Sequence, residues 1–473
     1  MKVLLVNPPA ARPLRSILPP EVEESRGRFP PLGILYLAAA IADLPGVETR
    51  VVDAQAEELS AADVGRIAGA GGYDLVGITT LTFTLLDAID VASAIKNERP
   101  EAVVIAGGPH AHLFPAETLA LGPIDAVARG EGEESFRALV AGWPGNKAAP
   151  PPGVWWKDGV RGEPKTAPPI EDLDRLRFPA RELSAVARYF SVLTDRNPIT
   201  TMMSSRGCPY KCVFCDRPHL GKRFRPRSAG NVVDEMEAAV RLGVREIVFY
   251  DDTFSVERER VRAIADEVLH RGLKIAWDIR ARVSDLGREE FALCRRAGLA
   301  RVHFGVESGD PDILRSLKKG ITIAQARAAF AAARAAGLET LAYFMVGLPG
   351  ETEVTLARTL ALARELDPDF VHFAALIPFP GTPLYADALA RGIIKRDVWA
   401  EFAAAPSPGF APPLWEENLK TAEIRAALLA LYRGFYRRPR VILRRLRRTR
   451  SLAGLWRGAR MGARVLFPRD RHD

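Results

Sequence analysis

Cysteine is scarce in this chain of 473 residues, which contains only four. Three of them are crowded into residues 208–215, which is not the spread of paired positions that a disulfide framework requires. We therefore expect a reducing, cytoplasmic setting. Long apolar runs are also missing: residues 32–42 form the longest one near the start, and about 20 residues are needed to span a bilayer. Met1 and Lys2 lead directly into an expected strand, so we expect no signal peptide.

Compositional extremes are absent as well. Hydrophobic residues make up 48% and charged residues 26%, which is ordinary for soluble globular proteins and excludes a disordered chain, a collagen-like fibre and a polytopic membrane protein. The length indicates two or three domains. The net charge of +8 is unevenly distributed, because residues 433–473 hold fourteen Arg, no Lys and two Asp. The rest of the chain is therefore mildly acidic.

Strand and helix patterns alternate over the first 140 residues. Expected strands cover residues 2–6, 48–53, 75–79, 102–106 and 126–128, and expected helices cover 33–44, 61–70 and 85–97. Such alternation with short connections predicts an α/β fold with a doubly wound parallel sheet, Rossmann-like, which binds ligands at the carboxyl ends of its strands.

The alternation resumes on a second sheet from residue 199. Expected strands cover residues 200–204, 246–250, 274–277, 301–306, 339–346 and 370–376, and expected helices cover 228–242, 257–271, 289–297, 324–336 and 353–365. Six repeats predict a partial (β/α)6 barrel. The expected divisions are a first domain (1–145), a Pro-rich linker with a hairpin at 154–159 (146–198), the barrel (199–400), and a helical, Arg-rich extension (401–473). An irregular segment is expected after Tyr385.

The cysteine cluster has the spacing C-x3-C-x2-C, formed by Cys208, Cys212 and Cys215 directly after the first strand of the second sheet. Three thiolates on one loop can hold three irons of a cubane and leave the fourth iron open to a substrate or cofactor. A zinc site is the alternative, with His219 as the nearest further ligand, but no second Cys or His pair follows. Three buried structural thiols are the remaining alternative. Cys294, in an amphipathic stretch, is expected to pack in the core.

Around these cysteines the chain resembles the radical S-adenosylmethionine (SAM) superfamily. The resemblance rests on Ser205-Arg206-Gly207 before the cysteines, on Phe214 before the last cysteine, and on segments that follow later strands in order: 250–254, 305–309, 344–350 and 378–383. It implies a [4Fe–4S] cluster on the three cysteines, with SAM on the open iron. The implied SAM contacts are Phe214, Asp251, Asp252, Glu307, Ser308, Gly347 and Pro349.

The first domain, placed before such a barrel, resembles the cobalamin-binding domain of cobalamin-dependent radical SAM enzymes. The residues expected to contact cobalamin lie at strand ends or in the loops that follow: Asn7, Pro8, Thr79, Thr80, Gly107, Gly108, Pro109, His110, Gly130, Glu131 and Gly132. The loop after the first strand lacks the pattern D-x-H-x-x-G, so we expect cobalamin without an axial histidine. His110 is expected to contact the corrin edge or nothing at all, and His112 is expected at the surface.

The resemblance implies a methyltransferase that acts on an unactivated carbon. In such enzymes a 5′-deoxyadenosyl radical abstracts hydrogen from the substrate, and methylcobalamin supplies the methyl group. An oxidative cyclase or rearrangement enzyme, resembling the anaerobic magnesium-protoporphyrin monomethyl ester cyclase, is the alternative. A metal-stabilised nucleic-acid-binding protein is the third and weakest reading.

The Arg-rich end of the chain alternates arginines with Leu, Trp and Phe, a composition typical of a helix lying on anionic lipid. A basic extension folded on the acidic body is the competing interpretation, and no recognised nucleic-acid module supports nucleic acid as a partner. We expect a small-molecule substrate, which would be a lipid, isoprenoid or tetrapyrrole-like compound if the tail meets membrane. A flavodoxin or ferredoxin is the expected reductant. The expected location is the cytoplasm, with peripheral contact at the inner face of the membrane.

Overall fold

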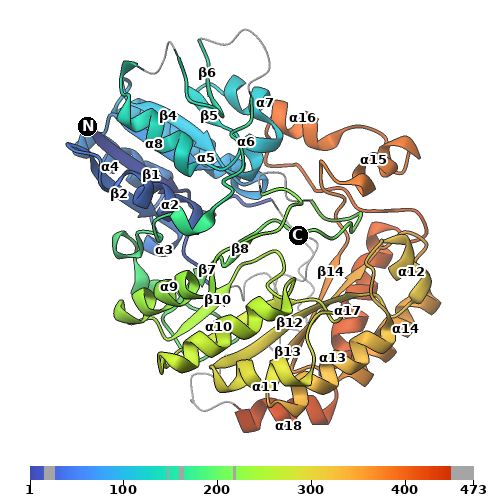
Figure 1. The fold of residues 1–473 in the computed structure, drawn as a ribbon. Coiled ribbons are helices and arrows are strands. Elements are labelled where there is room, and N and C mark those ends of the chain that lie inside the picture. Colours follow the sequence, from blue (N-terminus) through green and yellow to red (C-terminus); the bar gives the residue numbers. More distant parts are fainter. Residues whose placement is uncertain (15–26, 146–148, 159–164, 217–219, 449–473) are drawn as a thin grey trace.

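Two six-stranded sheets, each formed by its own part of the chain, organise the molecule (Figure 1). The computed structural model describes residues 1–14, 27–145, 149–158, 165–216 and 220–448. The first sheet lies above the second in Figure 1, and the segment from residue 165 to residue 198 connects them.

The first sheet has the strand order β2-β1-β3-β4-β5-β6. Its strands are β1 (Lys2–Asn7), β2 (Glu48–Asp53), β3 (Leu75–Thr79), β4 (Val103–Gly107), β5 (Ala126–Ala128) and β6 (Val154–Trp156). Its helices are α2 (Leu32–Ile41), α3 (Ala54–Glu57), α4 (Ala61–Gly71), η1 (Thr82–Thr84), α5 (Leu85–Glu98), α6 (Pro109–Leu113), α7 (Pro115–Ala120) and α8 (Glu133–Ala141). The first five strands run parallel, as the alternation predicts.

Helices cover both faces of this sheet, which explains why its central strands are largely apolar. Along β1, Val3 and Leu5 pack with α2 and α8, whereas Leu4 and Val6 pack with α4 and α5. Alternate residues of a strand point to opposite faces, so a continuous apolar run is what a doubly covered strand needs.

The first sheet continues into the segment expected as a linker. Strand β6 pairs antiparallel with β5, so Trp155 and Trp156 are buried in the first domain. The expected hairpin at residues 154–159 is not seen in the described residues, because the partner of β6 is β5. Residues 159–164 lie outside the described part. The rest of the connection contains η3 (Leu173–Arg175), η4 (Arg181–Leu183) and η5 (Val186–Arg188).

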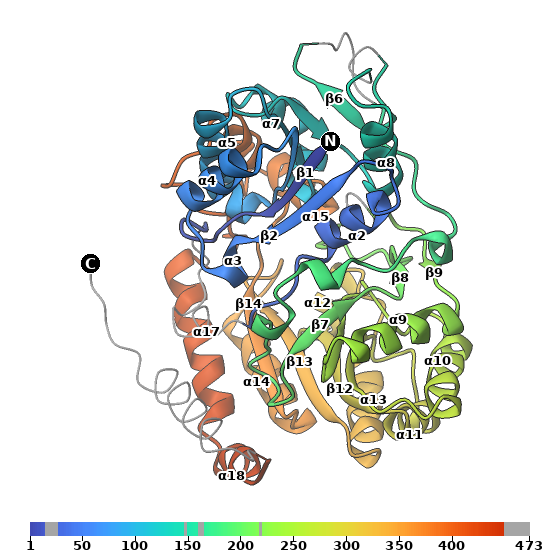
Figure 2. The same cartoon turned by 90° about the vertical axis from the view of Figure 1, so that its left-hand side faces the viewer.

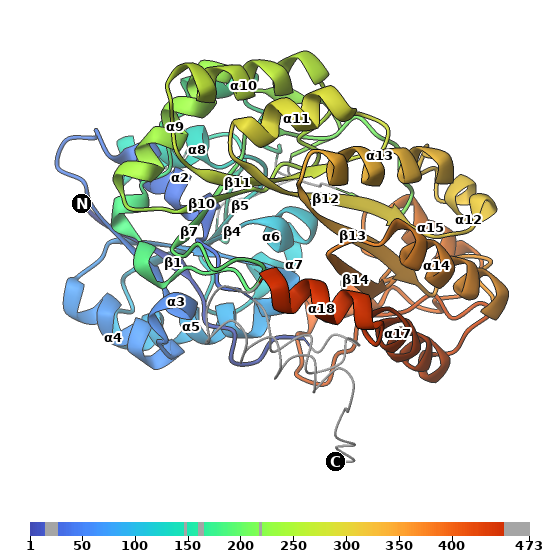
Figure 3. The same ribbon diagram turned by 90° about the horizontal axis from the view of Figure 1, so that it is seen from below.

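The second sheet is parallel, with the order β14-β13-β12-β11-β10-β7. Its strands are β7 (Ile199–Met202), β10 (Glu246–Phe249), β11 (Ala276–Ala281), β12 (Leu299–Glu307), β13 (Glu339–Val346) and β14 (Phe370–Ala375). Its helices are α9 (Ala229–Arg241), α10 (Arg258–His270), α11 (Arg288–Arg296), α12 (Pro311–Ser316), α13 (Ile323–Ala335) and α14 (Glu353–Leu366). Figure 3 shows the strands as an arc with these helices outside, the predicted partial barrel.

The sequence predicts a strand at residues 274–277, but β11 begins and ends further along the chain. The prediction followed the apolar residues, but the inner face of β11 is charged. Asp278 is buried against Arg301 of β12, at 3.3 Å, and Arg301 also pairs with Glu246 and Glu339. A buried guanidinium needs such partners, and its position near the strand amino ends leaves the carboxyl ends for the site.

Helix α17 (Thr421–Tyr436) closes the free edge of the barrel at β14 (Figure 2). The Tyr432 hydroxyl accepts from the Phe373 N–H at 3.2 Å and donates to the Phe373 carbonyl at 3.0 Å. The Tyr436 hydroxyl makes the same pair of bonds with Val371, both at 3.0 Å. Two tyrosines one helical turn apart therefore satisfy the backbone groups that an edge strand leaves unpaired.

The region after Tyr385 is more regular than predicted. It contains α15 (Pro383–Ala390) and α16 (Val398–Ala404) before α17, and the chain continues into α18 (Pro439–Arg448). These residues form regular helices because each helix buries an apolar face; Trp399 and Phe402 of α16, for example, are buried. No helix among the described residues is long and apolar enough to cross a membrane.

Candidate functional site

The cysteine loop, defined here as residues 207–216, begins where a two-stranded ladder ends. Strands β8 (Ser205–Arg206) and β9 (Arg225–Pro226) pair antiparallel at its base. Gly207 has φ +77°, and a Cβ there would lie 2.1 Å from the Arg223 carbonyl oxygen. Only glycine tolerates both conditions, so the loop is folded back on itself directly before Cys208.

All three cysteines lie on this loop, and none of them forms a disulfide. Cys208 is buried, with its sulfur 3.5 Å from the Thr253 hydroxyl beyond β10, whereas Cys212 and Cys215 are partly exposed. No group of three His, Cys, Asp or Glu side chains in the described ranges converges on one point as a metal site. Each of the three thiolates could hold one iron of a cubane. His219 lies outside the described residues.

Arg282 is a site residue that the sequence analysis missed. Its Nη1 lies 4.0 Å from the Cys212 sulfur, and its guanidinium sits over the Tyr210 ring, 3.7 Å from the centroid. The carbonyls of Lys319 and Gly320 accept from its Nη2. Arg282 directly follows β11, so correct placement of that strand would have put it at the carboxyl end. It places a fixed positive charge beside Cys212, one of the predicted cluster ligands.

Two of the expected SAM contacts, Asp251 and Ser308, are buried and hydrogen-bonded to neighbouring residues. The Asp251 carboxylate is buried and accepts from the Ser204 N–H and hydroxyl and from the Ser205 hydroxyl, at 2.5–2.7 Å. It therefore orders the strand that leads to the cysteines, and the neighbouring Asp252 is more exposed. Ser308 is likewise buried and accepts from the Asp310 N–H at 3.1 Å.

Glu307 and Phe214 are linked by a lysine. Glu307, at the end of β12, has φ +71° and pairs with Lys319 at 2.5 Å. The Lys319 ammonium lies 5.8 Å from the centroid of the Phe214 ring, on the cysteine loop. A non-glycine residue with positive φ is uncommon and marks a constrained site. Lys319 thus brings two of the predicted SAM residues together.

The loop that holds Gly347 and Pro349 is shaped by Glu351, another residue the sequence analysis did not single out. Glu351 is buried and accepts from the Gly347 N–H at 2.5 Å and the Leu348 N–H at 3.2 Å. No cation pairs with it among the described contacts, so burial outweighs the two N–H groups and raises its pKa to about 7. Gly347 has φ +79° and packs against Ile424 of α17.

The predicted cobalamin loops gather at the carboxyl edge of the first sheet, as the topology requires. Asn7 donates to Asp53 at 2.8 Å, and Pro8 follows it. Thr80 donates through its N–H and hydroxyl to the Gly107 carbonyl, at 2.6 and 2.8 Å. Gly108 has φ +106°, and a Cβ there would lie 3.0 Å from the Thr80 carbonyl. Thr79 ends β3, Pro109 begins α6, and Gly132 lies directly before α8, all at this edge of the sheet.

The two histidines of α6 are both buried, so the prediction of a surface position for His112 is wrong. The short helix contacts β4, β5 and α7, which cover it. His110 pairs through Nδ1 with the Thr82 hydroxyl at 3.0 Å, and burial lowers its pKa to about 4. These loops therefore present hydroxyl and backbone groups and the exposed Leu81, but no accessible imidazole among their described residues. This donor set fits cobalamin held without an axial histidine.

Glu131 does not stand open at the sheet edge. It is buried and pairs with Arg225, at 3.0 Å for one oxygen, and with Arg206 at 3.2 Å, while Glu133 also pairs with Arg206. Burial alone would raise its pKa, but the Arg225 hydrogen bonds and the Arg206 charge hold that pKa below the usual value. The loop containing Gly130 and Glu131 is therefore tied to the base of the cysteine loop.

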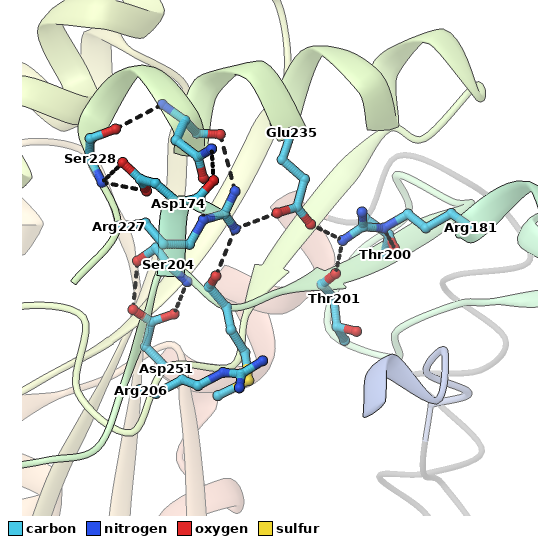
Figure 4. A network of polar contacts seen from close by, with 12 residues as sticks. Asp174, Arg181, Thr200, Thr201, Ser204, Arg206, Arg227, Ser228, Glu235 and Asp251 are labelled. Carbon is cyan, nitrogen blue, oxygen red and sulfur yellow. Dashed lines mark hydrogen bonds and ion pairs between the residues drawn. The ribbon is translucent and has the colours of Figure 1, made fainter. Parts of the chain in front are cut away.

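A second buried ion network supports the same region (Figure 4). Glu235 of α9 lies between Arg181 of the connecting segment, at 2.5 Å, and Arg227. Burial alone would raise the pKa of Glu235, but the two guanidinium groups hold it below its usual value. The connecting segment is thus fixed to the barrel beside the cysteine loop. Cys294 is fully buried in the core, as predicted, and burial raises its pKa to about 12.

Comparison with known proteins agrees with this architecture. The radical SAM superfamily matches residues 202–363, and the B12 binding domain matches residues 21–140. Over 450 residues the chain is 33% identical to the uncharacterized methyltransferase PH0819 of Pyrococcus horikoshii, covering 94% of each protein. The chain belongs to the cobalamin-dependent radical SAM enzymes. It is therefore an enzyme whose cofactors are a [4Fe–4S] cluster, SAM and cobalamin.

Two further comparisons concern a curated relative and a solved structure. Over 381 residues it is 30% identical to the anaerobic magnesium-protoporphyrin IX monomethyl ester cyclase of Rubrivivax gelatinosus, covering 77% of this chain and 67% of the cyclase. The solved structure of the radical SAM methyltransferase TsrM from Kitasatospora setae matches with a TM-score of 0.71 at 18% identity, over 98% of both chains. That structure shows the shared fold, and the methyltransferase relatives favour methyl transfer as the activity.

Proposed function

We propose that this enzyme methylates an unactivated carbon of a lipid, isoprenoid or tetrapyrrole-like small molecule. The observation that carries the proposal is the 33% identity to a methyltransferase over 94% of both proteins. A match of that extent includes both cofactor domains and their connection, so it is more informative than a match to either domain alone.

The bound cofactors supply the chemistry: SAM on the reduced cluster is the source of a carbon radical, and cobalamin carries the methyl group. The chain's own residues position them. Cys208, Cys212 and Cys215 would hold the cluster, with Arg282 beside it as a fixed charge. Lys319 orients Glu307 and Phe214, and Glu351 shapes the loop of Gly347, where SAM is expected.

Apolar side chains at the junction of the two domains support a largely apolar substrate. Phe83 of η1, which is partly buried, contacts Phe379, from the loop after β14, with ring centroids 6.1 Å apart. Phe379 is 40% exposed, and Leu81, directly before η1, is 44% exposed. Large hydrophobic residues that stay exposed beside a contact between two domains favour a binding surface. A substrate that meets both cofactors has to lie at this junction.

Oxidative cyclisation is the second candidate, because the cyclase of Rubrivivax gelatinosus is 30% identical. The two activities differ in their products. Methyl transfer yields S-adenosylhomocysteine and a substrate enlarged by one methyl group, whereas cyclisation consumes SAM without labelling the substrate.

The experiment uses SAM with a deuterated methyl group, a strong reductant, and lipid and tetrapyrrole extracts as substrate pools. Mass spectrometry should find the deuterated methyl group in one compound class together with S-adenosylhomocysteine. A variant with all three cluster cysteines changed to Ala should yield neither. Formation of 5′-deoxyadenosine with a new, unlabelled product would favour the cyclase instead.

We propose that the enzyme works in the cytoplasm, in peripheral contact with the inner face of the membrane, and receives electrons from a flavodoxin or ferredoxin. Ile442 and Leu443 of α18 are 43% and 53% exposed beside the arginines of that helix. Some of the basic side chains already pair with the protein itself: Arg438, Arg440 and Arg444 form ion pairs with Asp367. The rest of the Arg-rich tail, residues 449–473, lies outside the described structure.

Flotation with vesicles tests this contact. The full chain should float with vesicles rich in phosphatidylglycerol and not with pure phosphatidylcholine vesicles. A variant carrying Ile442→Asp and Leu443→Asp should lose most of the bound fraction. Equal flotation with both vesicle types, or an unaffected variant, would contradict the proposal.

A further inference from the structure

Two arginines close the base of the cysteine loop. Arg206 on β8 and Arg225 on β9 are direct cross-strand partners, and both are nearly fully buried. Like charges directly opposite one another in a ladder repel, and burial makes that repulsion stronger. The ladder therefore needs an anion between its two arginines.

Glu131 is that anion, and it comes from the other domain. Its Oε2 lies 3.0 Å from Arg225 Nη1 and 3.2 Å from Arg206 Nη1, and its Oε1 accepts from Arg225 Nη2. It also accepts from the Ile170 N–H at 2.9 Å, which completes its hydrogen bonds. Glu133, two residues on, pairs with the other amino group of Arg206.

This contact joins two loops that have different expected roles. Glu131 and Glu133 follow β5 in the loop expected to meet cobalamin, whereas Arg206 stands two residues before Cys208. Arg225 also donates to the Leu220 and Ile170 carbonyls, at 2.9 and 2.5 Å, so it joins the segment before β9 to the connecting segment. One carboxylate of the first domain thus contacts both strands of the ladder at the base of the loop that carries the predicted cluster ligands.

We propose that Glu131, assisted by Glu133, is a positioning residue that couples the cobalamin loop to the cluster loop. Closure of the cysteine loop depends on a side chain of the first domain, so a change in either loop is transmitted to the other. Such coupling is reciprocal: a substitution in this contact should loosen the cluster loop and should also weaken cobalamin binding. The proposal rests on the shown cofactors and not on the identity of the substrate.

The first test is Glu131→Gln in the full chain, with the cluster reconstituted anaerobically. We expect a chelator to remove iron about 10- to 100-fold faster than from the unaltered chain, as for other residues that orient metal ligands. In the cluster-free chain, amide hydrogen exchange should speed up in peptides covering residues 207–216 and stay unchanged in β13. A general loss of stability would raise exchange in both.

Two controls separate the proposed role from a loss of charge at the surface. Glu134→Gln changes the exposed neighbour of Glu133, and Arg223→Gln, two residues before Arg225, breaks an exposed ion pair with Glu171 of the connecting segment. Neither should change iron release or exchange. Glu131→Asp keeps the charge and should recover part of the effect.

The reciprocal test is Arg225→Gln, probed with hydroxocobalamin alone. Its Kd, followed by the absorbance change on binding, should rise about tenfold. The double variant Glu131→Gln with Arg225→Gln removes both partners, so its effect should be smaller than the sum of the two single effects. Iron release and hydroxocobalamin affinity that match the Glu134→Gln control, in variants that fold normally, would overturn the proposal.

Discussion

The guanidinium of Arg282 lies 4.0 Å from the sulfur of Cys212, stacked on the Tyr210 ring and held by backbone carbonyls of residues 319 and 320. A cation fixed at this distance stabilises the more negatively charged, reduced form of a cluster.

Replacement of Arg282 by Gln should therefore lower the reduction potential of the cluster. An electron paramagnetic resonance titration of the reconstituted enzyme measures this directly. Arg296→Gln, which changes an exposed arginine of α11, is the matched control. An unchanged potential in Arg282→Gln with normal iron content would show that the arginine only supports the loop.

Gly207→Ala should disrupt the cysteine loop. The new Cβ would collide with the Arg223 carbonyl, in a backbone conformation with φ +77°, and we expect a cost of about 1–3 kcal/mol together with a large loss of bound iron. Gly221→Ala is the matched control, because Gly221 has φ +75° but open space around its Cα. If both variants lose iron equally, backbone strain and not the collision is responsible.

Glu351 should make stability depend on pH. Its pKa is raised from 4.5 to about 7 by burial, so the folded state favours the protonated form. The stabilisation is complete below pH 4.5 and is lost as the pH rises through about 7. Relative to Glu351→Gln, the unaltered chain should lose ~3 kcal/mol across this window. Thermal unfolding at several pH values measures the difference, and parallel curves for the two proteins would contradict the assignment.

The two tyrosines of α17 should matter to the barrel edge. Tyr432→Phe or Tyr436→Phe leaves the backbone groups of Phe373 or Val371 without a partner in a packed interface. Each change should cost about 1–3 kcal/mol. Amide exchange should then increase at residues 371 and 373, and no change there would show that water replaces the hydroxyl.

Much of this architecture could be predicted from the sequence. The expected bounds of β2, β3, β5 and β13 agree with the structure to the residue, and the C-x3-C-x2-C spacing predicts the cluster loop. Strong periodicity and a short-range motif are sufficient where neighbouring residues in the sequence decide the structure.

The rest depends on contacts between residues far apart in the chain. Arg282 and Glu351 act through neighbours that only the folded barrel brings near. Glu131 was expected at cobalamin, but two arginines from the other domain occupy its carboxylate. His112 is polar and was expected at the surface, yet the packing of α6 buries it. No local pattern records such partners.

The central claim is that one chain binds both a [4Fe–4S] cluster and cobalamin. Iron, sulfide and cobalt analysis with an absorption spectrum tests it most directly, on protein purified without oxygen from cells supplied with cobalamin. We predict about four irons and one cobalt per chain, with iron lost when Cys208, Cys212 and Cys215 are changed to Ala. Zinc in place of iron, or iron without cobalt, would contradict the account.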